Sequence, residues 1–221
     1  MAGNPQSTPE ATSWAAAAQV LAERDPVIAR LVDQTGLPQV HEPTETRFEA
    51  LVRAIVYQQL AGAAASAIHG RLLAALGEPT PEQLLAQSPQ TLRSVGLSAR
   101  KAASLRDLAT KVMDGTVLLD QAGLRTETDD EVIARLTTVL GIGTWTAEMF
   151  LMFQLQRLDV WPTGDLGVRK GYGLAWGVPT PTPKKLDPLG DPYRPYRSVL
   201  AWYCWRAAEL LGGAGDSALT R

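Results

Sequence analysis

Helix start signals recur along this chain and constrain its fold more than any other feature. They are Thr80 with Pro81, Ser88 with Pro89, Ser98, and Thr128 with Glu131 three residues later. Each begins with a side chain that caps helices, and most are supported by a proline suited to the first turn or by a capping-box glutamate. No run of alternating β-branched residues with hairpin turns accompanies them. We therefore predict an all-α fold of about ten helices.

Apolar spacing places two of these helices. In residues 48–60 apolar side chains recur at three- and four-residue intervals, which is helical spacing. Residues 196–211 form a final helical stretch that Gly212 and Gly213 close. Six prolines in residues 177–195 predict a long, stiffened loop before that last helix.

Composition divides the chain into a folded body and two tails. Residues 1–12 are rich in Pro, Ser, Thr and Gln, and residues 212–221 are rich in small residues, so we predict a disordered and a flexible tail. Hydrophobic residues make up 45% of the 221 residues, enough to bury a core without disulfides. Residues 13–211 are predicted to form a single domain with two lobes.

Several functional classes are excluded by residues that the chain lacks. With one cysteine, Cys204, and two distant histidines, His41 and His69, the chain offers no disulfide, zinc site or iron-sulfur cluster. Neither a basic, apolar leader nor a run of eighteen apolar residues is present, so we expect a cytoplasmic protein with no membrane partner. No sustained heptads occur, and we expect a monomer.

Charge is distributed unevenly despite a net value of −2. Residues 93–111 carry five basic side chains against one acidic, and residues 166–206 carry seven against two. Such segments can present a basic face to phosphates, although solvated helix faces look the same in sequence.

Residues 136–153 carry the strongest functional signal. Two apolar helical segments are separated there by only Leu-Gly-Ile-Gly, in which Gly141 and Gly143 suit a tight hairpin or a close backbone approach. The hairpin leaves the first N–H groups of the second helix open at the positive end of its dipole, where Thr144 and Thr146 add hydroxyl donors. This arrangement favours phosphate binding, although a lone Gly-x-Gly is also common in ordinary turns.

Asp165 stands directly after Pro-Thr-Gly, where a new helix should begin, 20 residues after Trp145. Open N–H groups at a helix start favour the ionised form of a carboxylate. The residue therefore suits either an ordinary N-cap or a charged site.

The hairpin resembles the helix-hairpin-helix motif, LxGIGxxTA, which grips a nucleic-acid backbone without reading its sequence. With an Asp shortly after the hairpin, the chain resembles the helix-hairpin-helix (HhH-GPD) DNA glycosylase superfamily. The segments FEALVRAIVYQQL, GLSARKAASLRDLA, WPTGDLGVRKG and YRPYRSVLAWYCW extend this resemblance over about residues 45–208, in the order of the 3-methyladenine DNA glycosylase II group. The resemblance implies a two-lobed helical bundle with its active site in the cleft between the lobes.

The same resemblance implies a chemistry. Members of this group release alkylated purines, 3-methyladenine foremost and 7-methylguanine among others, from double-stranded DNA as the first step of base excision repair. An alkylated purine is already positive and leaves as a neutral base, so one carboxylate suffices, and Asp165 matches it. Trp145 stands where strand-cutting members have a nucleophilic lysine, which implies no lyase activity.

By resemblance, four side chains line the base pocket: Trp145, Trp205, Met149 and Tyr57. Aromatic faces stack well on a cationic base flipped out of the duplex. Packing in the core is the alternative for each tryptophan, and Trp202 is assigned to it.

Flipping a base requires a side chain to fill the hole. Gln58, Gln59 and Leu60 match the family's turn that enters the duplex, with Gln59 or Leu60 as the wedge. A polar helix end would explain Gln58 and Gln59 equally well.

Positive charges complete the predicted DNA contacts. Arg169 and Lys170 follow Asp165 and match phosphate contacts beside the lesion, whereas Arg100 and Lys101 are treated as simple surface charges. No cofactor is required, but in related proteins the hairpin carbonyls hold a sodium or potassium ion.

Two other functions stay open. One is a glycosylase for oxidised or deaminated bases. The other is a non-catalytic module that uses the hairpin alone to hold DNA and has no need of a carboxylate after it.

Overall fold

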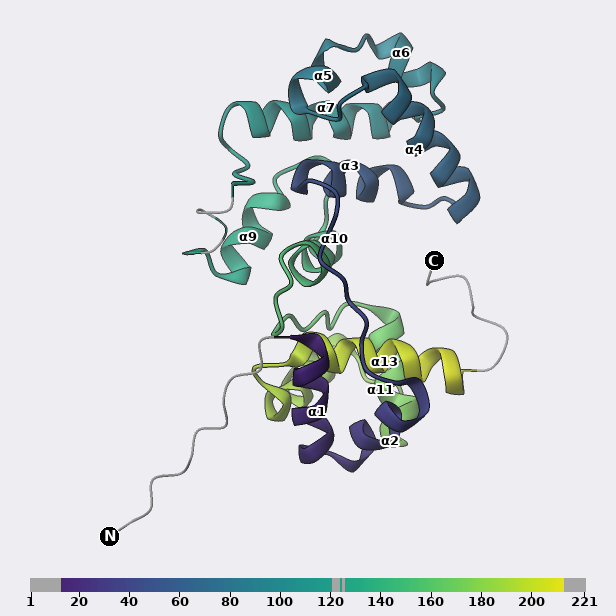
Figure 1. Ribbon diagram of the computed structural model, residues 1–221, viewed down its shortest axis with the longest axis vertical. Coiled ribbons are helices and arrows are strands. Elements are labelled where there is room, and N and C mark those ends of the chain that lie inside the picture. Colours follow the sequence, from purple (N-terminus) through teal and green to yellow (C-terminus); the bar gives the residue numbers. More distant parts are fainter. Residues whose placement is uncertain (1–12, 121–123, 125, 213–221) are drawn as a thin grey trace. The chain divides into compact units, whose positions relative to one another are not determined.

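The computed structural model describes residues 13–120, 124 and 126–212, and these residues contain helices and no strand (Figure 1). The all-α prediction is confirmed. The predicted tail over residues 1–12, and the other predicted tail from Gly213 onward, lie outside the described residues.

The chain divides into two compact units. The first, here called the terminal unit, contains the described residues up to His41 and those from Arg157 onward. The second, the middle unit, is the continuous stretch Glu42–Gln156.

The terminal unit is assembled around its last helix, α13. Its elements are α1 (Trp14–Arg24), α2 (Pro26–Thr35), α11 (Leu166–Trp176), α12 (Pro183–Leu186), the 3-10 helix η2 (Asp187–Tyr193) and α13 (Arg197–Leu211). Helix α13 packs against α11, α1, α2 and η2 (Figure 1). Val199, Leu200 and Tyr203 of α13 are fully buried, so this helix supplies much of the unit's core.

The proline-rich stretch before α13 was predicted to be one long loop, and that prediction is wrong in part. Residues 177–195 contain α12 and η2. Thr182 caps α12 and Pro183 occupies its first turn, where the missing N–H costs nothing. The same signal that marks other helices in this chain was hidden here by the surrounding prolines.

The middle unit contains the predicted capped helices. Its elements are α3 (Arg47–Tyr57), α4 (Gly62–Leu76), α5 (Pro81–Ala86), α6 (Pro89–Ser94), α7 (Ala99–Met113), α9 (Asp129–Leu136), α10 (Thr144–Met149) and the π-helix η1 (Phe150–Gln154). Helix α7 packs against α3, α5 and α6 (Figure 1). Thr80, Ser88 and Ser98 accept the expected N-cap hydrogen bonds, and the capping box at Thr128 is present, so these start signals are confirmed.

Helix α3 ends earlier than the sequence predicts. Apolar spacing favours a helix up to residue 60, but α3 stops at Tyr57 and the backbone turns away at Gln58. Gln59 then has a φ of 57°, which is outside the helical region. This break creates the turn before α4.

Helices α11 and α13 approach each other at a glycine. A Cβ atom added to Gly171 would lie 1.7 Å from the backbone oxygen of Cys204, so only glycine fits there. The Cys204 side chain is fully buried, and burial raises the pKa of its thiol well above the usual value. Such a thiol is a core residue and not a nucleophile.

Replacing Gly171 with alanine should separate these two helices. We expect Gly171→Ala to destabilise the terminal unit by about 3 kcal/mol or more, because the clash is with backbone that cannot rotate away. Gly70→Ala is the matched control, since a Cβ at this helical glycine meets nothing within 4 Å. It should stabilise the middle unit by roughly 0.5–1 kcal/mol. Differential scanning calorimetry checks that the stability falls in Gly171→Ala and rises in Gly70→Ala.

Candidate functional site

The hairpin between α9 and α10 requires glycine at one of its two glycine positions. Gly141 has a φ of 84°, and a Cβ there would lie 2.7 Å from the hydroxyl oxygen of Ser104. Gly143, the N-cap of α10, has an extended φ of −99°, and a Cβ there would meet nothing within 4 Å. No contact among the described residues therefore requires glycine at position 143, and its backbone is open to an approaching partner.

Helix α7 fastens the hairpin through an ion pair. The Asp107 carboxylate accepts the Leu140 N–H at 2.7 Å and the Lys111 ammonium at 2.9 Å, and Lys111 also donates to the Thr138 carbonyl. Burial works to raise the pKa of Asp107, but the Leu140 N–H and Lys111 outweigh it and leave the pKa below its usual value. This clamp is therefore complete at neutral pH and weakens as the pH falls through the range where Asp107 gains a proton.

The side chains after the hairpin differ in exposure. Trp145 is 51% exposed and Thr144 is also exposed, whereas Thr146 is only 8% exposed. Burial leaves Thr144 as the accessible hydroxyl of the predicted pair. Met149 is half-buried, just before the chain widens into the π-helix η1.

The turn between α3 and α4, residues 58–61, lies in the same unit as the hairpin. Its first side chain points inward, because the Gln58 amide donates to the Gly141 carbonyl at 2.9 Å. Gln59 is exposed, and Leu60 is 39% exposed. Of the three predicted DNA-contacting residues of this turn, Gln58 is therefore held in an internal contact, whereas the two wedge candidates, Gln59 and Leu60, lie at the surface.

Lys101 is not a simple surface charge. Its ammonium donates to the carbonyls of Val56 and Gln58, both at 2.6 Å. Burial lowers the pKa of Lys101 below its usual value, since a partly desolvated ammonium loses hydration. This contact could not be predicted from the sequence, because Lys101 and Val56 meet only through tertiary packing.

Tyr57, a predicted pocket residue, is held by two neighbours. Its ring meets His69 edge-on with the ring centres 5.9 Å apart, and the Arg53 guanidinium lies 5.9 Å from its centre. Burial, followed by the nearby Arg53 charge, lowers the pKa of His69.

In the terminal unit the structure brings Asp165 and Trp205 together. Asp165 is the N-cap of α11, and its Oδ1 atom accepts the Val168 N–H at 2.8 Å. The same oxygen accepts the indole N–H of Trp205, from α13, at 3.1 Å. Asp165 therefore caps α11 and also accepts a hydrogen bond from an indole. A role as an N-cap and a role as a charged site do not exclude each other.

Gly167 makes that contact possible and was missed by the sequence analysis. A Cβ on Gly167 would lie 2.9 Å from Cδ1 of the Trp205 ring and 3.1 Å from Oδ1 of Asp165. Gly167 and Gly171 are one helical turn apart on α11, so both face α13. The four-residue spacing of Gly167 and Gly171 can be seen in the sequence, but the sequence does not show that α13 packs against these two glycines.

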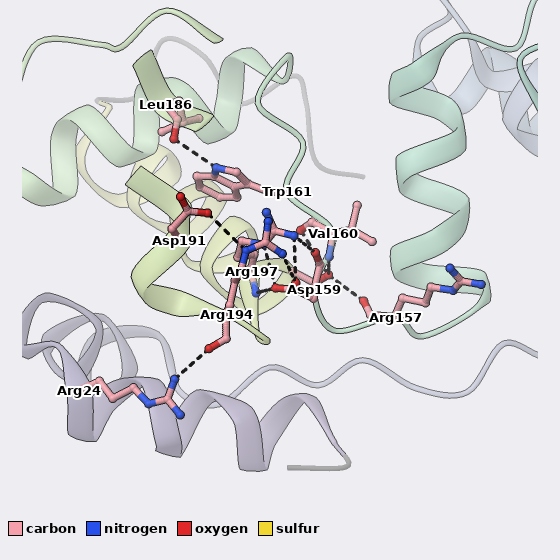
Figure 2. Close-up of polar contacts among 10 residues, drawn as sticks. Arg24, Arg157, Asp159, Val160, Trp161, Leu186, Asp191, Arg194 and Arg197 are labelled. Carbon is pink, nitrogen blue, oxygen red and sulfur yellow. Dashed lines mark hydrogen bonds and ion pairs between the residues drawn. The ribbon is translucent and has the colours of Figure 1, made fainter. Parts of the chain in front are cut away.

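The segment before Asp165 is anchored to the start of α13 (Figure 2). The Asp159 carboxylate accepts two hydrogen bonds from the Arg197 guanidinium, at 2.8 and 2.9 Å, and one from the Arg194 guanidinium at 2.8 Å. The buried Ser198 hydroxyl accepts the Val160 N–H at 2.9 Å and donates to the Arg157 carbonyl at 2.7 Å. These contacts fix the chain shortly before the carboxylate.

Trp161 lies in this anchored segment and belongs to the core. Its ring is buried, and its indole N–H donates to the Leu186 carbonyl at 3.3 Å (Figure 2). A Cβ on Gly190 would lie 2.5 Å from the same nitrogen, so η2 closes over the ring at a glycine.

Arg169 and Lys170 lie on α11 just after Asp165 and are half-buried. Arg169 donates to the Pro181 carbonyl at 3.4 Å, so part of its guanidinium holds the segment after α11. Trp202, predicted to be a core residue, is half-buried, and the Arg206 guanidinium lies 5.3 Å from its ring centre.

The predicted site residues thus form two groups, each within one unit. Asp165, Trp205, Arg169 and Lys170 belong to the terminal unit, and all other predicted site residues belong to the middle unit. The cleft between two lobes stays a prediction.

Across the described residues, no group of three His, Cys, Asp or Glu side chains is arranged to hold a metal ion. In that same part of the chain no helix is long and apolar enough to cross a bilayer.

The two hairpin glycines should respond differently to substitution. Gly141→Ala should cost about 1–3 kcal/mol, since it combines a positive φ with a clash against Ser104. Gly143→Ala should cost less than about 1 kcal/mol, because its φ is ordinary and its surroundings are open. Urea unfolding of the two variants checks this, and equal losses would contradict the assigned difference.

Known proteins similar to this chain include 3-methyladenine DNA glycosylases. A DNA-3-methyladenine glycosylase 1 from Schizosaccharomyces pombe is 35% identical over 187 residues, covering 82% of each chain. The solved structure of an S. pombe 3-methyladenine DNA glycosylase in complex with abasic DNA matches with a TM-score of 0.75 and 34% identity, covering 93% of this chain and 99% of that one.

A second solved structure, a DNA-3-methyladenine glycosidase from Bacillus halodurans, matches with a TM-score of 0.80 and 36% identity, over 89% of this chain and 90% of the other. Residues 52–192, more than half of the chain, match the HhH-GPD family of base excision DNA repair proteins. The resemblance seen in the hairpin and in Asp165 is confirmed at this level, and the chain belongs to the HhH-GPD superfamily of base excision DNA repair proteins.

Proposed function

We propose that this protein is a DNA glycosylase that releases alkylated purines, 3-methyladenine foremost, from double-stranded DNA as the first step of base excision repair. The observation that carries the proposal is the Asp165 carboxylate, which caps α11 and accepts a hydrogen bond from the Trp205 indole. It stands in a chain that is 35% identical to a 3-methyladenine glycosylase. 7-Methylguanine and related lesions fall in the same substrate class, because each leaves as a neutral base.

The reaction suits a single carboxylate. An N3- or N7-alkylated purine already carries a positive charge, so the glycosidic bond breaks without an acid to protonate the leaving base. The sugar is left with oxocarbenium character, which a nearby carboxylate stabilises while it orients or deprotonates water. Asp165 takes this role in our proposal.

The fold limits how far that carboxylate can move. Two donors from different elements, the Val168 N–H and the Trp205 indole, meet on one oxygen of Asp165. Upstream, the Asp159–Arg197 and Ser198 contacts hold the incoming chain. A carboxylate held in this way needs little reorganisation as charge develops on the sugar.

Binding of the duplex is assigned to the hairpin and the α3–α4 turn. The open backbone at Gly143 and the exposed Thr144 suit a DNA phosphate, with sequence-independent contacts. Trp145, which is half-exposed, supplies an aromatic face for an electron-poor base, with Met149 of the same unit as a further pocket residue. Gln59 or Leu60 fills the space that the flipped base leaves.

A sodium or potassium ion at the hairpin carbonyls stays a prediction, and nothing in the proposed reaction depends on it. Backbone carbonyls are suitable ligands, but three of them already accept protein donors: Thr138 from Lys111, Val139 from the Ile142 N–H, and Gly141 from Gln58. The hairpin's shape is therefore supported by the chain's own groups. A cytoplasmic location and a monomeric state likewise stay predictions.

Asp165→Asn should separate catalysis from binding and folding. Asn caps helices as well as Asp does, so the free energy of unfolding should change by less than about 1 kcal/mol. Release of methylated bases should fall by about 10²–10³-fold or more, because the charge that stabilises the sugar is gone. Chromatography of bases freed from methylated duplex DNA, alongside a DNA-binding titration, measures both.

Asp25→Asn is a closely matched control. Asp25 is also an N-cap in the terminal unit, and it also accepts an indole N–H, from Trp176 at 3.2 Å. We expect this variant to lose stability, since Tyr193 also donates to Asp25, but to release bases normally once folded. Unchanged base release in Asp165→Asn would overturn the role of Asp165, whereas failure of the wild type to release any base would favour the non-catalytic DNA-binding function.

The protein should also lack lyase activity. Trp145 cannot form the Schiff base that a lysine would form at this position. We expect borohydride to trap no covalent protein–DNA adduct during turnover, and the abasic product strand to stay intact until it is treated with alkali. A known glycosylase/lyase treated in parallel is the positive control, and a trapped adduct with this protein would overturn the assignment.

A further inference from the structure

The turn over residues 58–61 holds a strained shape at its exposed tip. Gln59 has a φ of 57°, a region that residues other than glycine enter only at some cost. Both Gln59 and the next residue, Leu60, are exposed. A strained and exposed turn keeps one shape only if other groups hold it there.

Lys101 is the group that holds the end of α3. The last carbonyls of a helix have no partner within it, and here the Lys101 ammonium takes two of them, those of Val56 and Gln58, both at 2.6 Å. A cation at this end of a helix is also favoured by the helix dipole. The contact joins α7 to α3 across 45 and 43 residues of sequence.

Gln58 connects the end of α3, which Lys101 holds, to the hairpin. Its carbonyl is held by Lys101 and its side-chain amide donates to the Gly141 carbonyl at 2.9 Å. The other side of the hairpin is held by Asp107, from the same helix as Lys101. One helix, α7, therefore fixes both the turn and the hairpin within the middle unit.

We propose that Lys101 is a positioning residue for base flipping, which holds the turn in the shape that presents Gln59 and Leu60 to the duplex at a fixed distance from the hairpin. This inference rests on the proposed glycosylase function. Lys101 itself touches neither the lesion nor the reacting atoms in this scheme. Its effect is transmitted through Val56 and Gln58.

The energetics of flipping supply a specific readout. Extruding a stacked, paired base costs a few kcal/mol, and least for a base that is mismatched or already unpaired. A preformed wedge therefore matters most for a paired lesion. A defect in positioning the wedge should disappear when the lesion has no partner base.

The test compares Lys101→Met with the wild type in single-turnover base release. The substrate is an oligonucleotide duplex with one methylated purine that the wild type releases, placed opposite its normal partner or opposite an abasic-site analogue. We expect the rate to fall by about tenfold or more on the paired lesion, because two charged hydrogen bonds are lost. On the unpaired lesion it should stay within about twofold of the wild type. Lys101→Arg, which keeps the cation, should recover much of the paired rate.

Arg106→Met is the matched control on the same helix. Arg106 also donates to two carbonyls at the end of a helix, Leu85 at 3.4 Å and Gln87 at 3.0 Å, but that helix is α5. Its loss should lower stability without changing the ratio of paired to unpaired rates.

Two results would overturn the inference: equal rate losses on both substrates in Lys101→Met, or the same change of ratio in Arg106→Met. If Lys101→Met does not fold, Lys101→Gln is measured in the same way, with 2-aminopurine fluorescence beside the lesion reporting flipping directly. Failure of the wild type to release any base would overturn the proposed function itself. Normal wild-type release and an inactive Asp165→Asn, with an unchanged ratio in the Lys101 variants, would overturn the positioning role alone.

Discussion

The close approach of α13 to α11 is the contact on which the candidate active site depends. Gly171 lets the backbone of α13, at the Cys204 carbonyl, come into direct contact with α11. One turn earlier, Gly167 leaves room for the Trp205 ring, whose N–H then reaches Asp165. Because two positions of α11 carry no side chain, the Trp205 indole can reach the Asp165 carboxylate. The close packing of α11 against α13 therefore also sets the geometry of the candidate site.

Helix α7 has the corresponding role in the middle unit. Three of its charged side chains, Lys101, Asp107 and Lys111, bond to backbone groups, whereas Arg100 is exposed. Lys101 takes the free carbonyls of α3, while Asp107 and Lys111 take the backbone of the hairpin. Partly buried charges of this kind are costly unless they are bonded, and here each one is bonded to backbone whose own partners were missing. The hairpin and the end of α3 are therefore held by a single helix.

Local signals in the sequence were enough to predict most of the fold but only part of the candidate site. N-caps such as Ser98 involve neighbours in sequence, so they could be predicted, and so could the family from the hairpin and Asp165. Tertiary contacts could not. Asp165 and Asp25 are both N-caps bonded to an indole, and the local pattern alone does not distinguish the proposed catalytic carboxylate from a structural one. Lys101 and Gly167 acquire their roles only from helices distant in the chain.

The discontinuity of the terminal unit has a consequence for how the protein is made. Residues 13–41 and 157–212 pack together, whereas the middle unit is one continuous stretch. During synthesis the middle unit leaves the ribosome whole, and domains generally fold as units in that order. Helices α1 and α2 emerge first, yet the faces that pack against α13 stay uncovered until that helix arrives. A nascent chain can thus carry a finished hairpin well before Asp165 and its Trp205 partner are in place.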